Sequence, residues 1–165
     1  MTIRRLGPTE WQRWRDFRLA MLREAPYAFG STYAEAVTFG DQEWQERTQR
    51  LAATDDSVLY VAEQGPDTDS TWLACAGGYV EEGMPNVFGV WTRPEARGNG
   101  YAEQCVRHVV DWARAKGKTE IRLWATDGND AARRVYERIG FAPNGNTQPL
   151  PSDPSRTESE YALRL

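Results

Sequence analysis

The sequence predicts an α+β fold in which a mostly antiparallel sheet contains one parallel crossover. Three apolar runs, at 57–63, 71–81 and 86–92, are separated by turn-forming residues, so they are expected to form an antiparallel meander. A glycine-rich turn, a helical pattern and the strand-like run 120–126 follow in that order. A strand, a helix and a strand joined in this way form a right-handed crossover with parallel strands.

The size and the charge of the chain limit the classes of function. A chain of 165 residues with 40% hydrophobic residues can bury a core, so residues 1–165 are expected to form a single domain. Acidic residues number 24 against 20 lysines and arginines, which argues against nucleic-acid binding. No apolar run is long enough for a signal peptide or a membrane span, so a cytoplasmic protein is expected. Cys75 and Cys105 lack metal-ligand spacing, and no metal is expected.

The N-terminal part of the chain predicts a strand followed by a helix. Residues 1–6 have the pattern of a short strand. Thr9 and Gln12 have the spacing of a capping box, which marks a helix start. Apolar residues then recur at helical spacing to about Glu24, and Pro26 is expected to stop the helix.

Two long connections are candidates for functional loops. Residues 26–40 form an aromatic connection that leads to a second helix, for which Asp41 is the expected N-cap. Residues 146–157 are rich in proline and serine and are expected to join two closing strands, at 140–145 and 158–165. Loops of this length usually have a function, although both segments could equally be surface cover.

The turn at 97–102, RGNGYA, leads from a strand into a helix that is expected at about 99–116 and is capped by Gly117. Free backbone amides and the helix dipole make such a turn an anion site, and glycine lets a phosphate come close. The P-loop motif is absent, and the dinucleotide fingerprint fails at Glu103. On its own the turn fits either a phosphate site or a plain strand-to-helix connection.

Together, the turn and a later helix resemble the GNAT superfamily of acyl-CoA-dependent N-acetyltransferases. Residues 97–102 reproduce its Q/R-x-x-G-x-G/A signature. The run NDAARRVYERIGF fits its N-x-x-A-x-x-x-Y-x-x-x-G-F pattern, in which the matching residues are Asn129, Ala132, Tyr136, Gly140 and Phe141. The order of the expected elements is similar as well, so the resemblance covers nearly the whole chain. Segments 26–36 and 149–165 look like those of a bacterial, largely actinobacterial branch.

The resemblance implies a specific sheet and a co-substrate. The sheet would be mixed and mostly antiparallel, with six to seven strands, parallel central strands 4 and 5 splayed apart, and about four flanking helices. Acetyl-CoA would bind with its pyrophosphate on the turn and its pantetheine between the splayed strands. The residues implied in CoA binding are Val90, Trp91, Thr92, Arg97, Gly98, Asn99, Gly100, Tyr101, Ala102, Asn129 and Ala132. Gly89 would suit a strand bulge that drives the splaying, or a simple accommodation of packing.

The resemblance also implies a reaction, the transfer of acetyl to a primary amine by direct attack in a ternary complex. The acceptor is expected to be a small molecule, and the alternatives are a protein N-terminus, a lysine, or no acceptor at all in an acyl-CoA-sensing domain. Tyr136 matches the tyrosine that protonates the departing CoA thiolate, although its place on an apolar helix face also fits a core residue. A monomer or a homodimer is expected.

The residue that removes the amine proton is less well defined. The strand at 86–91 contains no acidic residue, whereas some members of the superfamily have a glutamate there. Glu35, Glu81 and Glu82 are the nearest candidate bases, with water as a possible relay, and each also fits a solvated surface acid. Aromatic residues expected to wall the acceptor site, or else to belong to the core, are Phe29, Tyr33 and Trp124.

Overall fold

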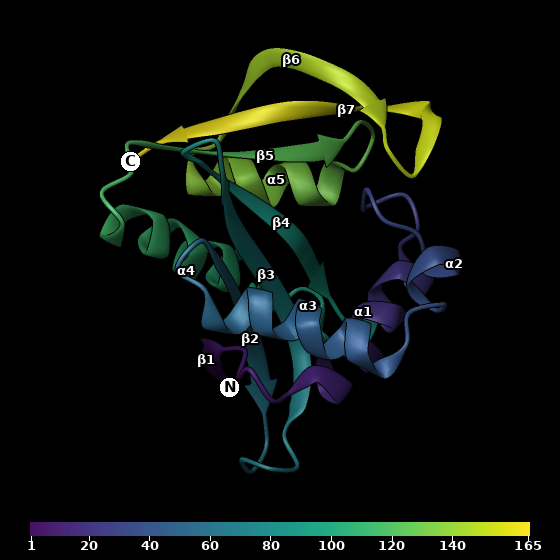
Figure 1. Ribbon diagram of the computed structural model, residues 1–165. Coiled ribbons are helices and arrows are strands. Elements are labelled where there is room, and N and C mark those ends of the chain that lie inside the picture. Colours follow the sequence, from purple (N-terminus) through teal and green to yellow (C-terminus); the bar gives the residue numbers. More distant parts are fainter.

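A computed structural model describes residues 1–165, and these contain one seven-stranded sheet (Figure 1). The strands are β1 (Thr2–Arg5), β2 (Ser57–Gln64), β3 (Thr71–Glu81), β4 (Met84–Thr92), β5 (Glu120–Thr126), β6 (Ala142–Leu150) and β7 (Asp153–Arg164). Their order in the sheet is β1-β2-β3-β4-β5-β7-β6. Only β4 and β5 pair in parallel, so the predicted mixed sheet with one crossover is confirmed.

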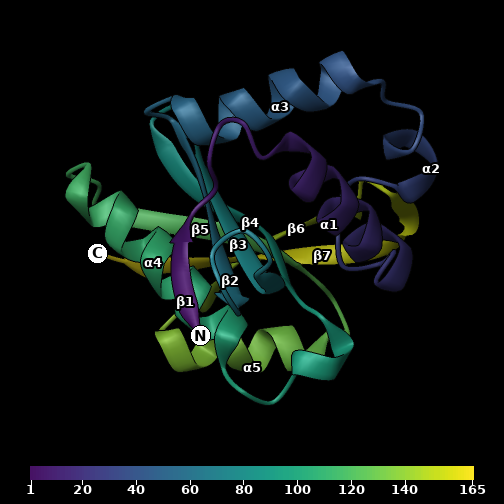
Figure 2. The ribbon, with the colours of Figure 1, turned by 90° about the horizontal axis from the view of Figure 1, so that it is seen from below.

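The helices cover both faces of this sheet. They are α1 (Trp11–Glu24), α2 (Tyr33–Ala36), α3 (Asp41–Ala53), the 3₁₀ turn η1 (Pro94–Ala96), α4 (Tyr101–Ala115) and α5 (Asp130–Ile139). Figure 2 shows α1 and α3 on one side of the sheet and α4 and α5 on the other. The additional helix α2 is a single turn inside the connection 26–40, which we expected to be irregular.

Each helical layer buries its own group of apolar side chains against the sheet. The apolar stripe predicted for α1 is buried, including Trp14, Phe17 and Met21, in a cluster of 13 residues that also contains Trp44 of α3. On the other face, α4 and α5 contribute to a cluster of 17 buried residues that includes Tyr136. Both clusters hold the helices in place around the centre of the sheet.

The start of α1 differs from the prediction. Its N-cap is Glu10, and the expected capping box of Thr9 and Gln12 does not form. The Glu10 carboxylate instead accepts a hydrogen bond from the backbone N–H of Gly7, at 2.7 Å, and pairs with Arg4 at 2.8 Å. A tertiary ion pair with β1 therefore fixes this end of the helix, and local capping does not.

The helices α3 and α4 also start at residues other than the expected ones. Gly40 is the N-cap of α3, and Asp41 is the first helical residue, where its charge favours the positive end of the dipole. The helix α4 begins at Tyr101 with Gly100 as N-cap. Because glycine has no side-chain oxygen, the first amides of α4 receive no side-chain cap.

Residues 146–157 were wrongly predicted as a connection. They belong to β6 and β7, which turn at Pro151 and Ser152. Pro149 is compatible with a strand because β6 is at the edge of the sheet, where proline is tolerated, and Pro151 lies in the turn.

The strands β4 and β5 separate soon after they meet. They pair at only two residues of β4, Asn86 and Val87. Beyond them β4 stays paired with β3 as far as Thr92, so its other edge has no strand partner. The register against β3 shifts near Gly89, whose φ of 61° favours glycine and fits a bulge. Both the splaying and the bulge at Gly89 are confirmed.

Candidate functional site

A cleft of about 490 Å³ opens where β4 leaves β5. It is lined by Glu24, Ala25, Ala28, Val90, Trp91, Thr92, Ala96, Arg97, Gly98, Gly100, Tyr101, Ala102, Glu103, Asn129, Ala131, Ala132, Val135, Tyr136 and Arg138. The fold thus brings together every residue predicted to bind CoA except Asn99, and it adds Tyr136 to the same cleft. The residues from the end of α1 were not predicted from the sequence.

The glycine-rich turn presents unused hydrogen-bond donors to this cleft. No backbone N–H group from residue 98 to residue 103 donates to a protein acceptor. Gly98 and Gly100 have φ of 85° and 74°, and a Cβ at either position would meet no atom within 4 Å. The positive end of the α4 dipole lies at the same place. The arrangement is suited to a phosphate group.

Two polar side chains hold the turn in position. The Asn99 side chain donates to the carbonyl of Ala96 at 2.9 Å, and the backbone N–H of Asn99 has no protein acceptor. Arg97 Nη2 and Trp91 Nε1 both donate to Glu24 Oε2, at 2.8 and 2.7 Å. Burial raises the pKa of Glu24, but these hydrogen bonds outweigh it and the net pKa falls below 4.5. Glu24 therefore joins the end of α1 to β4 and to the turn as a carboxylate.

The free edge of β4 forms a second wall. Trp91 and Thr92 are paired with β3 on one side, Val90 lies in the bulge, and all three residues line the cleft without a strand partner on the other side. An extended ligand that carries amide groups can add to such an edge as a further strand.

Tyr136 belongs to the core and to the cleft at once. It is 6% exposed, and its ring lies edge-on to Phe141 at 6.2 Å between centroids. Burial raises the pKa of Tyr136 well above 10, and no hydrogen bond or charge contributes, so the phenol is protonated at neutral pH. Asn129 is the N-cap of α5 and accepts from the N–H of Ala132 at 3.3 Å.

Two of the three candidate bases are far from the cleft. Glu81 and Glu82 are exposed at the β3–β4 turn, whereas the cleft begins at Val90 near the other end of β4. With a rise of about 3.3 Å per residue, the intervening stretch of β4 spans about 20 Å. Glu35 lies on α2 and lines a second cavity.

This second cavity, of about 420 Å³, lies between α1, α2, α3 and β4. It is lined by Trp14, Arg18, Leu22, Ser31, Thr32, Glu35, Ala36, Phe39, Trp44, Arg47, Arg50, Leu51, Ser57 and Phe88. Phe88 lines the cavity and Val90 lines the cleft, so the two hollows meet β4 on either side of Gly89. We did not predict this cavity, although one signal was present: Arg18 interrupts the apolar stripe of α1.

The aromatic residues expected to wall the acceptor site line neither hollow. Phe29 is buried, and the Arg18 guanidinium lies 5.2 Å from its ring centre. The Tyr33 hydroxyl accepts a hydrogen bond from Arg23 at 3.0 Å. Trp124 is half-buried on β5. Phe29 therefore contacts Arg18, which lines the second cavity, without lining the cavity itself.

The two long segments singled out in the sequence contact one another (Figure 1). The Ser152 hydroxyl, at the turn between β6 and β7, donates to the carbonyl of Phe29 at 2.6 Å. The Thr126 hydroxyl, at the end of β5, donates to the carbonyl of Tyr27 at 2.6 Å. The closing hairpin thus supports the connection 26–40, which supplies Ser31 and Thr32 to the second cavity.

Other kinds of site find no support in the described side chains. Both cysteines are buried and free. No group of three or more His, Cys, Asp or Glu side chains is arranged to hold a metal ion. None of the helices has both the length and the apolar character needed to span a bilayer.

Known proteins match this chain over most of the elements just described. The Acetyltransferase (GNAT) family matches residues 14–141. Streptothricin acetyltransferase of Streptomyces lavendulae is 30% identical over 110 residues, which are 67% of this chain and 57% of that protein. Mycothiol acetyltransferase of Streptosporangium roseum is 31% identical over 65 residues, which are 39% of this chain and 19% of that protein. The chain therefore spans less than two thirds of either relative.

Solved structures share the fold at low identity. A GNAT acetyltransferase from Streptococcus pneumoniae has a TM-score of 0.79 at 14% identity, with 99% of both chains covered. The spermidine N-acetyltransferase from Vibrio cholerae, solved with CoA and spermine, has a TM-score of 0.76 at 14% identity, with 99% of this chain and 94% of that chain covered. The family match, the shared fold and the cleft with its two motifs agree, and the chain belongs to the GNAT acetyltransferase family.

Proposed function

We propose that this chain transfers the acetyl group of acetyl-CoA to a primary amine by direct attack in a ternary complex, with residues 1–165 acting as one domain. The observation that carries the proposal is a single cleft that joins an uncapped amide turn, an unpaired strand edge and a buried tyrosine. Membership of a family that uses acetyl-CoA supports it.

Each wall of the cleft has a part in binding the co-substrate. The amides of residues 98–103 bind the pyrophosphate, and Arg97 adds a positive charge beside them. The edge of β4 at 90–92 binds the amide groups of pantetheine as an added strand. This arrangement places the thioester near the bulge at Gly89.

The chemical step removes two protons from an alkylammonium acceptor, one before attack and one as the amide forms, and supplies one proton to the leaving thiolate. An alkylammonium with a pKa near 10.4 is neutral only about once in a thousand at pH 7, so the acceptor must lose a proton before attack. We propose that Glu35 accepts this proton, directly or through water, because Glu35 is the candidate base that lines a cavity. The amine nitrogen then bonds to the acetyl carbon, backbone donors near the bulge stabilise the oxyanion, and the carbon–sulfur bond breaks. Tyr136 protonates the thiolate that leaves, and the resulting tyrosinate takes the second proton that the nitrogen loses as the amide forms.

We propose that the acceptor is a small molecule and that it binds in the second cavity. A volume of about 420 Å³ falls within the range of small-molecule sites. The cavity reaches β4 at Phe88, next to the bulge at which the thioester is placed. Both sequence relatives are named for small molecules, streptothricin and mycothiol.

A screen of amines with acetyl-CoA tests the reaction. Thiol release should depend on an amine, and mass spectrometry should detect a product about 42 Da heavier, as acetyl transfer requires. Calorimetry with CoA is the companion measurement. CoA binding without thiol release from any small amine or peptide would identify a sensing domain, and the absence of CoA binding would remove the proposal altogether.

A further inference from the structure

The second cavity carries an excess of positive charge. Arg18, Arg47 and Arg50 line it, against a single carboxylate, that of Glu35. Arg47 is already paired with Glu43 at 2.7 Å. Neither Arg18 nor Arg50 forms an ion pair with an acidic side chain, so the cavity has unmatched cations for a ligand.

Arg18 is the most unusual of these residues. Its Nη1 atom is buried and has no hydrogen-bond partner. Burial lowers the pKa of Arg18 from its ordinary value, because the enclosed site disfavours an unpaired charge. Buried guanidinium groups in proteins are normally paired, so an orphaned one that faces a cavity points to a missing anion.

Arg18 lies close to the proposed site of the reaction, so an anion bound by Arg18 would also lie close to it. Its Nη1 lies 3.7 Å from the place that a Cβ on Gly89 would occupy. Gly89 is the bulge that separates the cavity from the cleft, and the proposed thioester lies beside it. A group bound by Arg18 is therefore close to the amine that attacks, and both can belong to one small molecule.

We propose that the acceptor is an amine that also carries a carboxylate, as in an amino acid, and that Arg18 binds this carboxylate. The assignment rests on the proposed acetyl transfer. The planar fork of a guanidinium matches the two oxygens of a carboxylate. Arg50 adds to the positive field, and the same field disfavours a polyamine, which has only positive charges.

Matched acceptors test the inference directly. Free amino acids, their C-terminal amides, aminoalkyl phosphonates and spermidine are compared by kcat/KM for thiol release, with products identified by mass. The free acids should exceed their amides by at least about tenfold, because a buried donor left without its partner penalises the amide. A preference for phosphonates or spermidine, or equal use of acids and amides, would overturn the inference and leave acetyl transfer standing.

Variants of Arg18 show whether this residue is the cause. Arg18→Gln should raise the KM for a free amino acid by about tenfold or more and abolish the preference over the amide, while CoA affinity stays the same. Arg18→Lys should restore part of the preference because it keeps the charge and loses the fork. Arg15→Gln is the matched control, since Arg15 lies on the same helix but pairs with Asp16 outside the cavity.

A binding measurement keeps the inference testable if no amine is turned over. Free amino acids should raise the melting temperature of the wild-type protein, and their amides should not. The rise should vanish in Arg18→Gln, provided that circular dichroism shows the variant folded. The absence of any carboxylate-dependent rise would refute the inference, whereas failure to bind CoA refutes the proposed function instead.

Discussion

At the scale of single residues, Tyr136 shows how one side chain combines packing with chemistry. Its ring is part of a buried cluster, and its hydroxyl lines the cleft without a protein partner. The raised pKa of Tyr136 keeps the phenol protonated at neutral pH, so the side chain holds a proton that it can donate. The packing role of Tyr136 depends on its ring and the proposed catalytic role depends on its hydroxyl, so removal of the hydroxyl alone separates the two roles.

Tyr136→Phe should lower kcat by about 10²- to 10⁴-fold, because it removes the proton donor and keeps the ring in contact with Phe141. CoA affinity and melting temperature should stay the same. Tyr161→Phe is the matched control, because Tyr161 is buried in the same cluster but does not line the cleft. Equal rates in both variants, under conditions where chemistry limits, would make Tyr136 a core residue only.

The glycine turn gives a second prediction at this scale. Gly100→Val should weaken CoA binding by about 1 to 3 kcal/mol, which is about 5- to 150-fold in Kd, because a side chain strains a backbone with φ of 74° and enters the phosphate position. Calorimetry with CoA measures the loss. Gly117→Val is the control, since Gly117 has the same φ of 74° with open space around it and does not line the cleft. Equal CoA affinity in the two folded variants would show that the turn does not bind the pyrophosphate.

At the scale of elements, the closing hairpin and the end of β5 both hold the connection 26–40. Two side-chain hydroxyls, of Ser152 and Thr126, reach backbone carbonyls of the connection. The connection in turn supplies part of the second cavity. We therefore expect the hairpin to affect acceptor binding through the connection 26–40, without lining the cavity itself.

Ser152→Ala and Thr126→Val should each lower the free energy of unfolding by about 0.5 to 1.5 kcal/mol, because each leaves a carbonyl without its donor. Both should raise the KM for the acceptor and leave the Kd for CoA unchanged. Ser155→Ala, in the same hairpin, removes a hydroxyl that bonds only to Asp153 and should change neither constant. Unaltered acceptor kinetics in both test variants would separate the hairpin from acceptor binding.

Elements defined by short-range patterns could be predicted from the sequence, and features made by tertiary contacts could not. The apolar stripe of α1 and the meander could be predicted from residue spacing. The glycine-rich turn at 97–102 could be predicted from its motif residues. The start of α1 could not, because Arg4 of β1 holds Glu10 in place. The extension of β6 beyond residue 145 was missed because its Pro149 is tolerated only at a sheet edge, and the edge is set by the fold. The second cavity forms where several elements meet, so short-range patterns do not predict it. The one signal in the sequence was Arg18, which interrupts the apolar stripe of α1.

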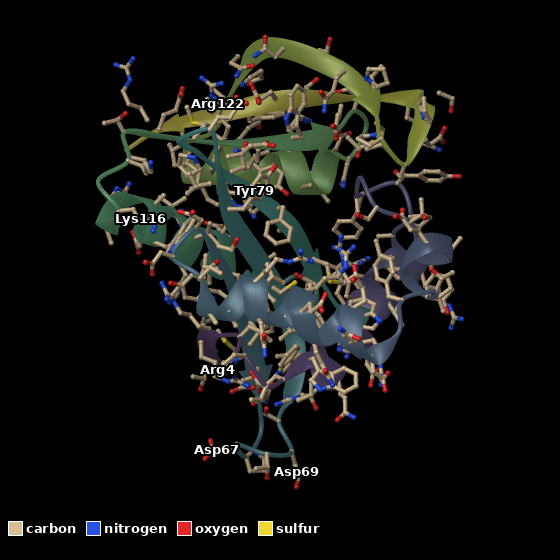
Figure 3. All side chains as sticks on the ribbon, viewed as in Figure 1. Arg4, Asp67, Asp69, Tyr79, Lys116 and Arg122 are labelled. Atoms are coloured by element: carbon tan, nitrogen blue, oxygen red, sulfur yellow. The ribbon has the colours of Figure 1, made fainter.

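At the scale of the whole molecule, an ion-pair network ties β1, β2 and α1 together. Arg4, on β1 (Figure 3), bonds to Glu10 at 2.8 Å and to Glu63 of β2 at 2.7 Å. Burial raises the pKa of both glutamates, but the hydrogen bonds from Arg4 and other donors outweigh it and both net pKa values fall below 4.5. A carboxylate whose pKa is lower in the folded chain than in the unfolded chain stabilises the fold at a pH above its unfolded-state pKa. This stabilisation is lost as the pH falls through the folded-state pKa.

We therefore expect the melting temperature of the wild type to decrease when the pH is lowered below about 4.5. Arg4→Met should lower the melting temperature at pH 7 and should make its decrease at acidic pH smaller. The shift at pH 7 should be about 2 to 4 °C for each kcal/mol of lost stability in a chain of this size. Arg5→Met is the control, because Arg5 is exposed and forms no ion pair with a carboxylate. Parallel pH curves for Arg4→Met and the wild type would show that the network does not set the acid stability.

The two hollows meet β4 on either side of the bulge at Gly89, and they share no lining residue. Each co-substrate can then arrive or depart while the other stays bound, and neither blocks the route of its partner. A relay through a covalent acyl-enzyme has no suitable thiol, because burial raises the pKa of Cys105 to about 12 and that of Cys75 further, so both remain protonated. Initial-velocity plots at several fixed acceptor concentrations should intersect, whereas parallel lines would mean that the acetyl group stops on the protein.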